Sequence, residues 1–233
     1  MNSDTDAKKK LKSAFLLNTK EKNRLIKVIE ELQTLSNIKQ SIQNKVFCIG
    51  SNKTGTTSLD AAMKILGFKS MPEELAYSYI LRDKDSKNQV NNFRNLMKTN
   101  TQNFNFFEDL PFCFGNNYKL IDHFYPDAKY ILTLRDPEAW FSSCNRWIEA
   151  LNCKPIYSWI WGIDFSFENK NKIIKLYNKR NSEIIRHFNS TNKLMELQIE
   201  TATYRILCQF LGIDLDSVSK LDFPMENIND FKK

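Results

Sequence analysis

The stretch Val46-Phe47-Cys48-Ile49-Gly50-Ser51-Asn52-Lys53-Thr54-Gly55-Thr56-Thr57-Ser58 decides the fold of this chain. It begins with a continuous apolar run of four residues, which is typical of a buried parallel strand. A loop rich in hydroxyl groups follows, and apolar residues then recur at helical spacing from Leu59 to Leu66. A strand, a glycine-containing loop and a helix in this order predict the beginning of a nucleotide-binding α/β fold.

The loop has the glycine spacing of a Walker A motif, at Gly50 and Gly55, but it lacks that motif's lysine. Thr56 stands at the lysine position, Thr57 keeps the following hydroxyl, and the loop's lysine is Lys53. Backbone N–H groups at the start of the helix can still bind an anion, because the helix dipole favours negative charge there. The loop therefore suits a phosphate or phosphosulfate better than Mg·ATP. The alternative is a hydroxyl-rich helix cap that binds no ligand.

The rest of the chain alternates between strand and helix patterns. Further strands are predicted over 104–107, 129–134 and 194–199, and helices over 73–100, 116–124, 137–150, 168–189 and 201–211. Residues 154–167 are rich in aromatic side chains and are expected to be irregular. This order predicts a three-layer, P-loop NTPase-like α/β fold, with a central parallel sheet flanked by helices on both faces. Ligands of such folds bind beyond the carboxyl ends of the strands.

The positive charge is concentrated at the beginning of the chain. The net charge is +7, of which +5 belongs to residues 1–45 and +2 to the remaining residues. We expect residues 1–44 to form a basic tail and an amphipathic helix, and residues 45–233 to form the P-loop α/β domain. Because the surplus charge lies mostly outside the α/β domain, nucleic acid is not the expected partner.

Composition excludes several classes of protein. The chain is 42% hydrophobic and 26% charged, which are values of a globular protein. Five scattered cysteines without a C-x-x-C pair predict neither disulfides nor a zinc site, and we expect no metal. No apolar run approaches the roughly 18 residues of a membrane helix, and the start lacks the apolar segment of a signal peptide. A cytoplasmic location is expected, and the oligomeric state stays open.

Two motifs resemble a known family. The segment from Asn52 to Ser58 resembles the 5′-phosphosulfate loop of P-loop sulfotransferases, which use 3′-phosphoadenosine 5′-phosphosulfate (PAPS). Arg135 after the third predicted strand, with Ser143 eight residues later, resembles that family's 3′-phosphate motif. The segment 125–137 is similar to the bacterial and lower-eukaryotic branch called sulfotransferase-like. The resemblance covers about residues 45–225.

The resemblance implies a set of donor-binding residues. They are Lys53, Thr54, Gly55, Thr56, Thr57 and Ser58 in the loop, together with Arg135 and Ser143. Chemistry agrees for Arg135, because a guanidinium binds a phosphate through two parallel hydrogen bonds. The alternative is a surface Arg135 that pairs with Asp136 or Glu138.

The resemblance also implies a catalytic pair. Lys53 would neutralise charge on the leaving oxygen, and a base would accept the acceptor's proton. The cytosolic branch has a histidine before Leu-Pro at that place, and here Asp109 precedes Leu110-Pro111. Neighbours on a strand point to opposite faces, so only one of Asp109 and Glu108 can face the pocket. We favour Asp109, which takes the position of that histidine. An aspartate acting near pH 7 needs a raised pKa. The alternative is that Asp109 caps the following turn or pairs with Lys53 or Arg135.

The expected function is metal-independent transfer of a sulfuryl group from PAPS to a hydroxyl or amine of a small molecule, glycan or lipid. One alternative is a divergent P-loop nucleotide kinase. Another is a non-catalytic module that binds a nucleotide or a partner. Tryptophans cluster between residues 140 and 161, either as a hydrophobic core and lid or as an acceptor pocket. Ser58 replaces the tryptophan that stacks on adenine in the cytosolic branch, and Tyr177, Tyr204 and Phe223 are candidates for that role.

Overall fold

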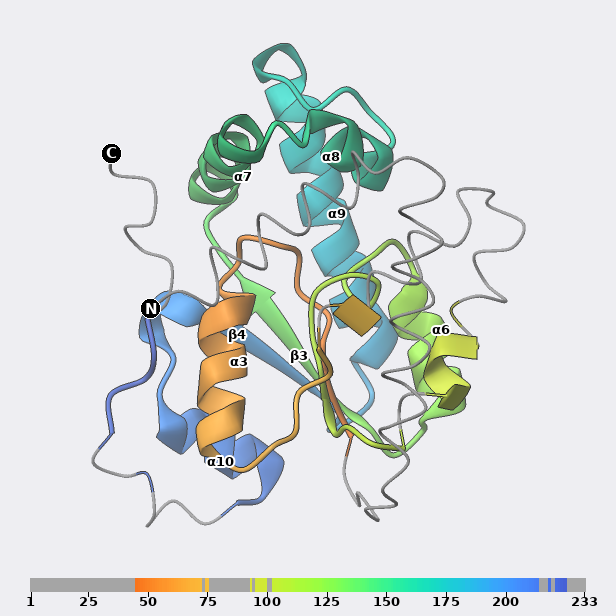
Figure 1. Cartoon of the computed structure of the whole chain (residues 1–233), viewed down its shortest axis with the longest axis vertical. Helices are drawn as coiled ribbons and strands as arrows, with labels where there is room; N and C mark the ends of the chain where they lie inside the picture. The colour runs from red at the N-terminus through yellow and green to blue at the C-terminus, as the bar shows by residue number, and fades with distance from the viewer. Residues whose placement is uncertain are drawn as a thin grey trace.

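The computed structural model describes residues 45–72, 74–75, 93, 95–99, 102–213, 218 and 221–225 (Figure 1). The predicted tail and helix within residues 1–44 lie outside the described residues. Most of the helix predicted over 73–100 lies outside them as well.

The central sheet has four parallel strands in the order β2-β1-β3-β4. They are β1 (Val46–Cys48), β2 (Phe106–Phe107), β3 (Lys129–Leu134) and β4 (Leu194–Gln198). Val46 lies opposite Phe106 on one side and Lys129 on the other. The chain passes from β1 to β2 on one side and then to β3 on the other, so the topological switch point lies at the carboxyl end of β1. The predicted parallel sheet is confirmed, with β2 shorter than expected.

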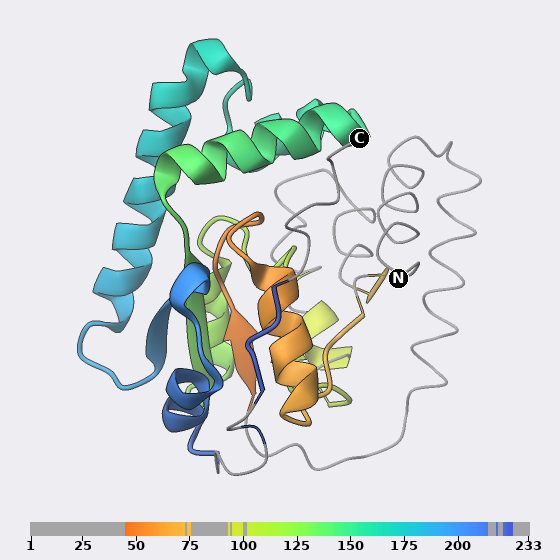
Figure 2. The same cartoon turned by 90° about the vertical axis from the view of Figure 1, so that its left-hand side faces the viewer.

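Helices cover both faces of the sheet, as the three-layer prediction requires. The helices α3 (Thr56–Ile65) and α10 (Tyr204–Leu211) lie on one face, and α6 (Asn117–Phe124) and α9 (Lys170–Phe188) on the other (Figures 1 and 2). Cys48 packs with Leu59 and Leu207 on the first face, whereas Phe47 packs with Ile121 and Ile184 on the second. Because both faces of β1 are buried, its sequence is apolar at every position rather than alternating.

A third apolar cluster lies beyond the carboxyl ends of the strands. It joins α7 (Pro137–Leu151), α8 (Lys154–Trp161) and the first half of α9, which follows the short 3-10 helix η1 (Phe167–Asn169) (Figures 1 and 2). Its centre is Trp140, which is fully buried and stacks on Tyr177 with 4.1 Å between the ring centroids. The cluster therefore covers the carboxyl edge of the sheet, which is the edge where ligands of this fold bind.

The expectation of irregular structure over 154–167 was wrong for α8. Pro155 occupies the first turn of this helix, where a missing N–H costs nothing. Gly162 ends it in a left-handed conformation with φ 65°. The aromatic side chains obscured the helical pattern because they pack on several neighbouring elements rather than along one stripe.

Two further observations bear on the sequence expectations. None of the five cysteines forms a disulfide, and all are buried. Within the described ranges, no helix combines the length and the apolar character that crossing a bilayer demands.

Candidate functional site

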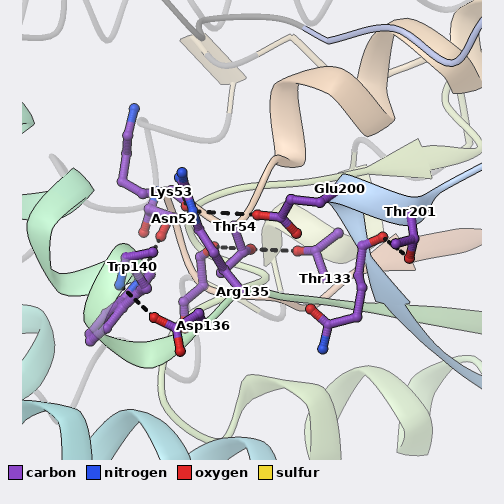
Figure 3. Close-up of polar contacts among 12 residues, drawn as sticks. Asn52, Lys53, Thr54, Thr133, Arg135, Asp136, Trp140, Glu200 and Thr201 are labelled. Atoms are coloured by element: carbon purple, nitrogen blue, oxygen red, sulfur yellow. Dashed lines mark hydrogen bonds and ion pairs between the residues drawn. The ribbon is translucent and has the colours of Figure 1, made fainter.

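The candidate site is built from the segments that follow the four strands. Because the strands are parallel, these segments meet at one edge of the sheet. The glycine-containing loop follows β1, Asp109 follows β2, Arg135 follows β3, and Glu200 follows β4 in the 3-10 helix η2 (Ile199–Thr201). Figure 3 shows the loop, Arg135 and Glu200 close together.

The loop backbone has the features of an anion site. Lys53 and Gly55 adopt left-handed conformations with φ 69° and 91°, and turns of this kind direct backbone N–H groups into a common concavity. Gly55 is the N-cap of α3 and has no side chain to cap the helix, and the first turn of α3 carries no acidic residue. The positive end of the helix is therefore open to an anion.

The two glycines also have a packing reason. A Cβ atom on Gly50 would lie 2.0 Å from Thr133 Oγ1, and one on Gly55 would lie 2.4 Å from Ile199 Cγ1. Thr54 packs in the same place: its Oγ1 donates to Ser51 O at 2.6 Å and lies 2.6 Å from Thr133 Oγ1. Because the hydroxyl of Thr54 is buried and engaged, this residue can serve a ligand through its backbone.

Arg135 reaches from the end of β3 to the loop. Its Nη1 donates to the backbone oxygen of Lys53 at 3.2 Å, and its Nε lies 3.6 Å from Glu200 Oε1 (Figure 3). The Tyr177 hydroxyl accepts from the Arg135 backbone N–H at 3.2 Å, which ties this strand end to α9. The guanidinium of Arg135 thus lies against the loop backbone at Lys53.

The carboxylates next to Arg135 in the sequence have other partners. Asp136 is the N-cap of α7 and accepts from the Ala139 N–H at 2.9 Å. Glu138 lies 2.5 Å from Lys170 Nζ at the beginning of α9. The alternative in which Arg135 pairs with Asp136 or Glu138 is therefore wrong, and its ion pair is with Glu200.

The Lys53 side chain contacts α7. Its Nζ lies 4.0 Å from the ring centroid of Trp147, which is a cation–π contact. Ser143 is one turn before Trp147 on the same helix face, and its side chain is buried. The role of Ser143 toward a 3′-phosphate stays a prediction.

Asp109 joins β2 to the loop. Its Oδ1 accepts from the Leu110 N–H at 2.7 Å and from Asn52 Nδ2. Burial raises the pKa of Asp109, while the hydrogen bonds from Leu110 and Asn52 and the charge of Lys53 oppose the rise. Asp109 thus caps its own turn, as one alternative had it, and also contacts Asn52 of the loop after β1. The neighbouring Glu108 is half-buried, and its role stays a prediction.

Backbone strain is concentrated at the two candidate catalytic residues. Among the described residues other than glycine, positive φ angles occur at Lys53, Asp109 and Asn152. Asn152 is an ordinary C-cap at the end of α7. A left-handed conformation costs about 1–2 kcal/mol for other residue types, and such strain gathers at functional sites.

Several residues of the site were not among the predicted ones. Asn52 was within the quoted loop but had been assigned no role. Trp147 lies four residues after Ser143 in a predicted helix, and this spacing puts the two residues on the same helix face. Arg180 lies three residues after Tyr177, on a side of α9 that faces the molecule, and it donates from Nη2 to the backbone oxygen of Ile49 at 3.0 Å. A basic residue within an apolar helical stripe was the signal for it.

One of the three candidates for stacking on adenine, Tyr177, already stacks on another aromatic ring. Tyr177 is 1% exposed and stacks on Trp140, so a base cannot stack on it without displacing that ring. Tyr204 begins α10, and its ring centroid lies 5.5 Å from that of Phe223, in the apolar cluster that covers the α3 and α10 face of the sheet. Their proposed role is untested.

The fold and the site define a class of protein, an α/β protein with a candidate anion-binding loop at the switch point of its sheet. A family model for the sulfotransferase domain matches residues 45–166, which is more than half of the chain. The chain therefore belongs to the sulfotransferase family, whose members transfer sulfuryl groups. The match includes the loop, Asp109, Arg135 and Ser143. A search of curated proteins found no significant match.

Proposed function

We propose that this chain transfers a sulfuryl group from PAPS to a hydroxyl or amine of an acceptor. The observation that carries the proposal is the hydrogen bond from Arg135 Nη1 to the backbone of Lys53. It brings an anion-binding loop at the end of β1 next to a guanidinium at the end of β3. PAPS carries anionic groups at its 5′ and 3′ positions, and two adjacent cationic sites fit such a molecule.

The donor would be held mainly by the loop and by Arg135. The loop backbone, Lys53 and the hydroxyls of Thr56, Thr57 and Ser58 would bind the 5′-phosphosulfate. Arg135 and Ser143 would bind the 3′-phosphate. The ion pair of Arg135 with Glu200 is partly exposed, and pairs of this kind contribute about 0–1 kcal/mol, so a phosphate can replace it.

The reaction would need one base and one cation. An acceptor oxygen attacks the sulfur, a new O–S bond forms, and the S–O bond to the 5′-phosphate breaks. Asp109 would take the proton of the acceptor, and its raised pKa suits this role near neutral pH. Lys53 would neutralise the phosphate oxygen that leaves. Its contact with Trp147 is worth about 0.5–1 kcal/mol, less than a charge-assisted hydrogen bond, so the donor can draw the ammonium group away.

The kinase alternative predicts a different ligand. A Walker A loop needs its lysine to hold the β- and γ-phosphates, and Thr56 stands at that position. Lys53 lies at the other end of the loop, where it contacts Trp147. The sulfotransferase proposal therefore predicts preference for adenosine 3′,5′-bisphosphate, the product of PAPS, over Mg·ATP.

Calorimetric titration tests this proposal. The bisphosphate should bind in the micromolar range, Mg·ATP should bind much more weakly, and EDTA should leave transfer from PAPS unchanged. Lys53→Ala and Arg135→Ala should each weaken bisphosphate binding by about 10–100-fold, because each removes charge-assisted hydrogen bonds worth about 1.5–3 kcal/mol. The control is Lys64→Ala, which removes an exposed lysine at the far end of α3. Absence of bisphosphate binding, or tighter binding of Mg·ATP, would contradict the proposal.

A further inference from the structure

A cavity of about 190 Å³ lies between α8, α9 and the segment after Asp109. Ile160 and Trp161 of α8 and Leu176 of α9 give it apolar walls. Its charged lining residues are Lys179, Arg180 and Glu183 of α9, of which Lys179 and Glu183 form an ion pair at 3.9 Å. For comparison, an apolar cavity of about 150 Å³ is large enough to hold benzene. The space therefore suits a molecule of about one ring.

The cavity adjoins the proposed base. Cys113, which lines it, has its Sγ 3.9 Å from Asp109 Oδ1 and 3.5 Å from Asn52 Oδ1. Asp109 and Asn52 are thus separated from the cavity by a single side chain. A molecule in the cavity is therefore one side chain, that of Cys113, away from the carboxylate that the proposed reaction uses as its base.

Arg180 places an uncompensated positive charge in the cavity wall. Its Nη2 donates to Ile49 O at 3.0 Å and its Nε to Gly115 O at 3.3 Å. Within the described part of the chain, its Nη1 is buried without a hydrogen-bond partner and no carboxylate lies at ion-pair distance from it. Two carbonyl oxygens satisfy hydrogen bonds but do not neutralise a charge, and a buried unpaired charge is costly. An anion in the cavity would supply the missing counter-charge.

We propose that this cavity is the acceptor subsite, and that it takes a hydroxyl compound of single-ring size whose carboxylate is bound by Arg180. The inference rests on the proposed sulfuryl transfer and extends it to the class of acceptor. A guanidinium fork matches a carboxylate in geometry as well as charge. Trp161 and Leu176 contact the body of the acceptor, and its hydroxyl points to the wall formed by Cys113, behind which Asp109 lies.

A pair of probes isolates the charge. 4-Hydroxyphenylacetate and 4-hydroxyphenylacetamide share a ring and a hydroxyl and differ in charge. We expect the carboxylate probe to bind at least about 10-fold more tightly to the protein saturated with adenosine 3′,5′-bisphosphate, measured by ligand-observed NMR titration. Arg180→Gln should reduce this preference to near one. The matched control is Arg186→Gln, which neutralises an exposed arginine two turns along the same helix and should keep the preference.

A second variant acts in the opposite direction. Glu183→Gln removes the negative charge from the cavity wall and should tighten binding of the carboxylate probe several-fold without changing the amide probe. A gain of this kind cannot come from misfolding, so the inference stays testable even where Arg180→Gln lowers stability. Unfolding temperatures of all variants are measured alongside.

Two outcomes would overturn the inference. They are equal binding of both probes to the unaltered protein, and a preference that survives in a folded Arg180→Gln variant. A protein that binds the bisphosphate but shows no preference for the carboxylate contradicts this inference alone. A protein that does not bind the bisphosphate contradicts the proposed function.

Discussion

At the scale of single residues, Lys53 and Asp109 are both held in left-handed conformations by groups from other elements. The backbone oxygen of Lys53 accepts from Arg135, and the carboxylate of Asp109 accepts from Asn52. These contacts offset the conformational cost, which is about 1–2 kcal/mol for Lys53 and smaller for Asp109, because aspartate adopts this region more readily. The contact with Asn52 also holds the carboxylate of Asp109 against the loop.

The raised pKa of Asp109 predicts that replacing this residue lowers activity without lowering stability at neutral pH. Burial raises that pKa above its ordinary value of 3.8, so the folded protein binds this proton more tightly than the unfolded chain. The contribution of Asp109 to stability is therefore present at low pH and is lost as the pH rises from 3.8 through the raised value. Asp109→Asn should not lower the unfolding temperature at pH 7, because the amide oxygen can still accept the same hydrogen bonds. The same variant should lower kcat/KM by about 10²–10⁴-fold, because it removes the base.

The pH profile and a neighbour complete that test. kcat/KM of the unaltered protein should increase with pH as Asp109 loses its proton, with the midpoint above 3.8. Glu108→Gln is the matched control and should leave kcat nearly unchanged. If Glu108→Gln abolished activity and Asp109→Asn did not, the two roles would be reversed.

At the scale of elements, the loop between β1 and α3 is shaped by its neighbours as much as by its own residues. Thr133 of β3 leaves no room for a side chain at Gly50, and Ile199 after β4 leaves none at Gly55. The Walker-like spacing thus lets two other strand ends approach the loop backbone. The same close packing positions Arg135 and Glu200 at the site.

Alanine substitutions at Gly55 and Gly67 distinguish the cost of backbone strain from the cost of a steric clash. Gly55 and Gly67 have similar φ angles of +91° and +84°, but a Cβ atom meets Ile199 only at Gly55 and open space at Gly67. Gly67→Ala should cost about 1–2 kcal/mol, the price of a left-handed alanine. Gly55→Ala should cost about 1–3 kcal/mol more through overpacking, and it should also weaken bisphosphate binding. Urea unfolding and calorimetry measure both quantities, and equal losses for the two variants would contradict this account.

At the scale of the whole molecule, the described residues form three apolar clusters. Two of them lie on the two faces of the sheet, and the third joins α7, α8 and α9 above the strand ends. We propose that residues 45–233 form the catalytic domain and that residues 1–44 are an appendage to it. The appendage would carry most of the net charge of the chain.

Deleting residues 1–44 tests this division. The piece 45–233 should unfold at nearly the temperature of the full chain and bind the bisphosphate with the same affinity. Any salt-dependent binding of nucleic acid or of an acidic partner should be confined to the full chain. Loss of bisphosphate binding in the shorter piece would show that the appendage belongs to the site. Salt-dependent binding retained by the shorter piece would favour the alternative of a non-catalytic binding module.

The sequence by itself determined the order of the strands and of most of the helices that flank them, and it indicated the family. Local patterns suffice for this, because the apolar run of β1, the spacing of Gly50 and Gly55 and the periodicity of the helices depend on near neighbours. The parallel sheet follows from the alternation of strands and helices, and it brings Asp109 and Arg135 to the same edge.

Tertiary structure alone decided which side chains touch. Asn52 and Asp109 are 57 residues apart in the chain, and Arg180 and Ile49 are 131 apart. Such contacts depend on how helices pack over the sheet, and no local period encodes that packing. The aromatic segment that becomes α8 escaped prediction for the same reason. The strand ends could therefore be located from the sequence, whereas the partners of Lys53, Asp109 and Arg180 were set by long-range packing.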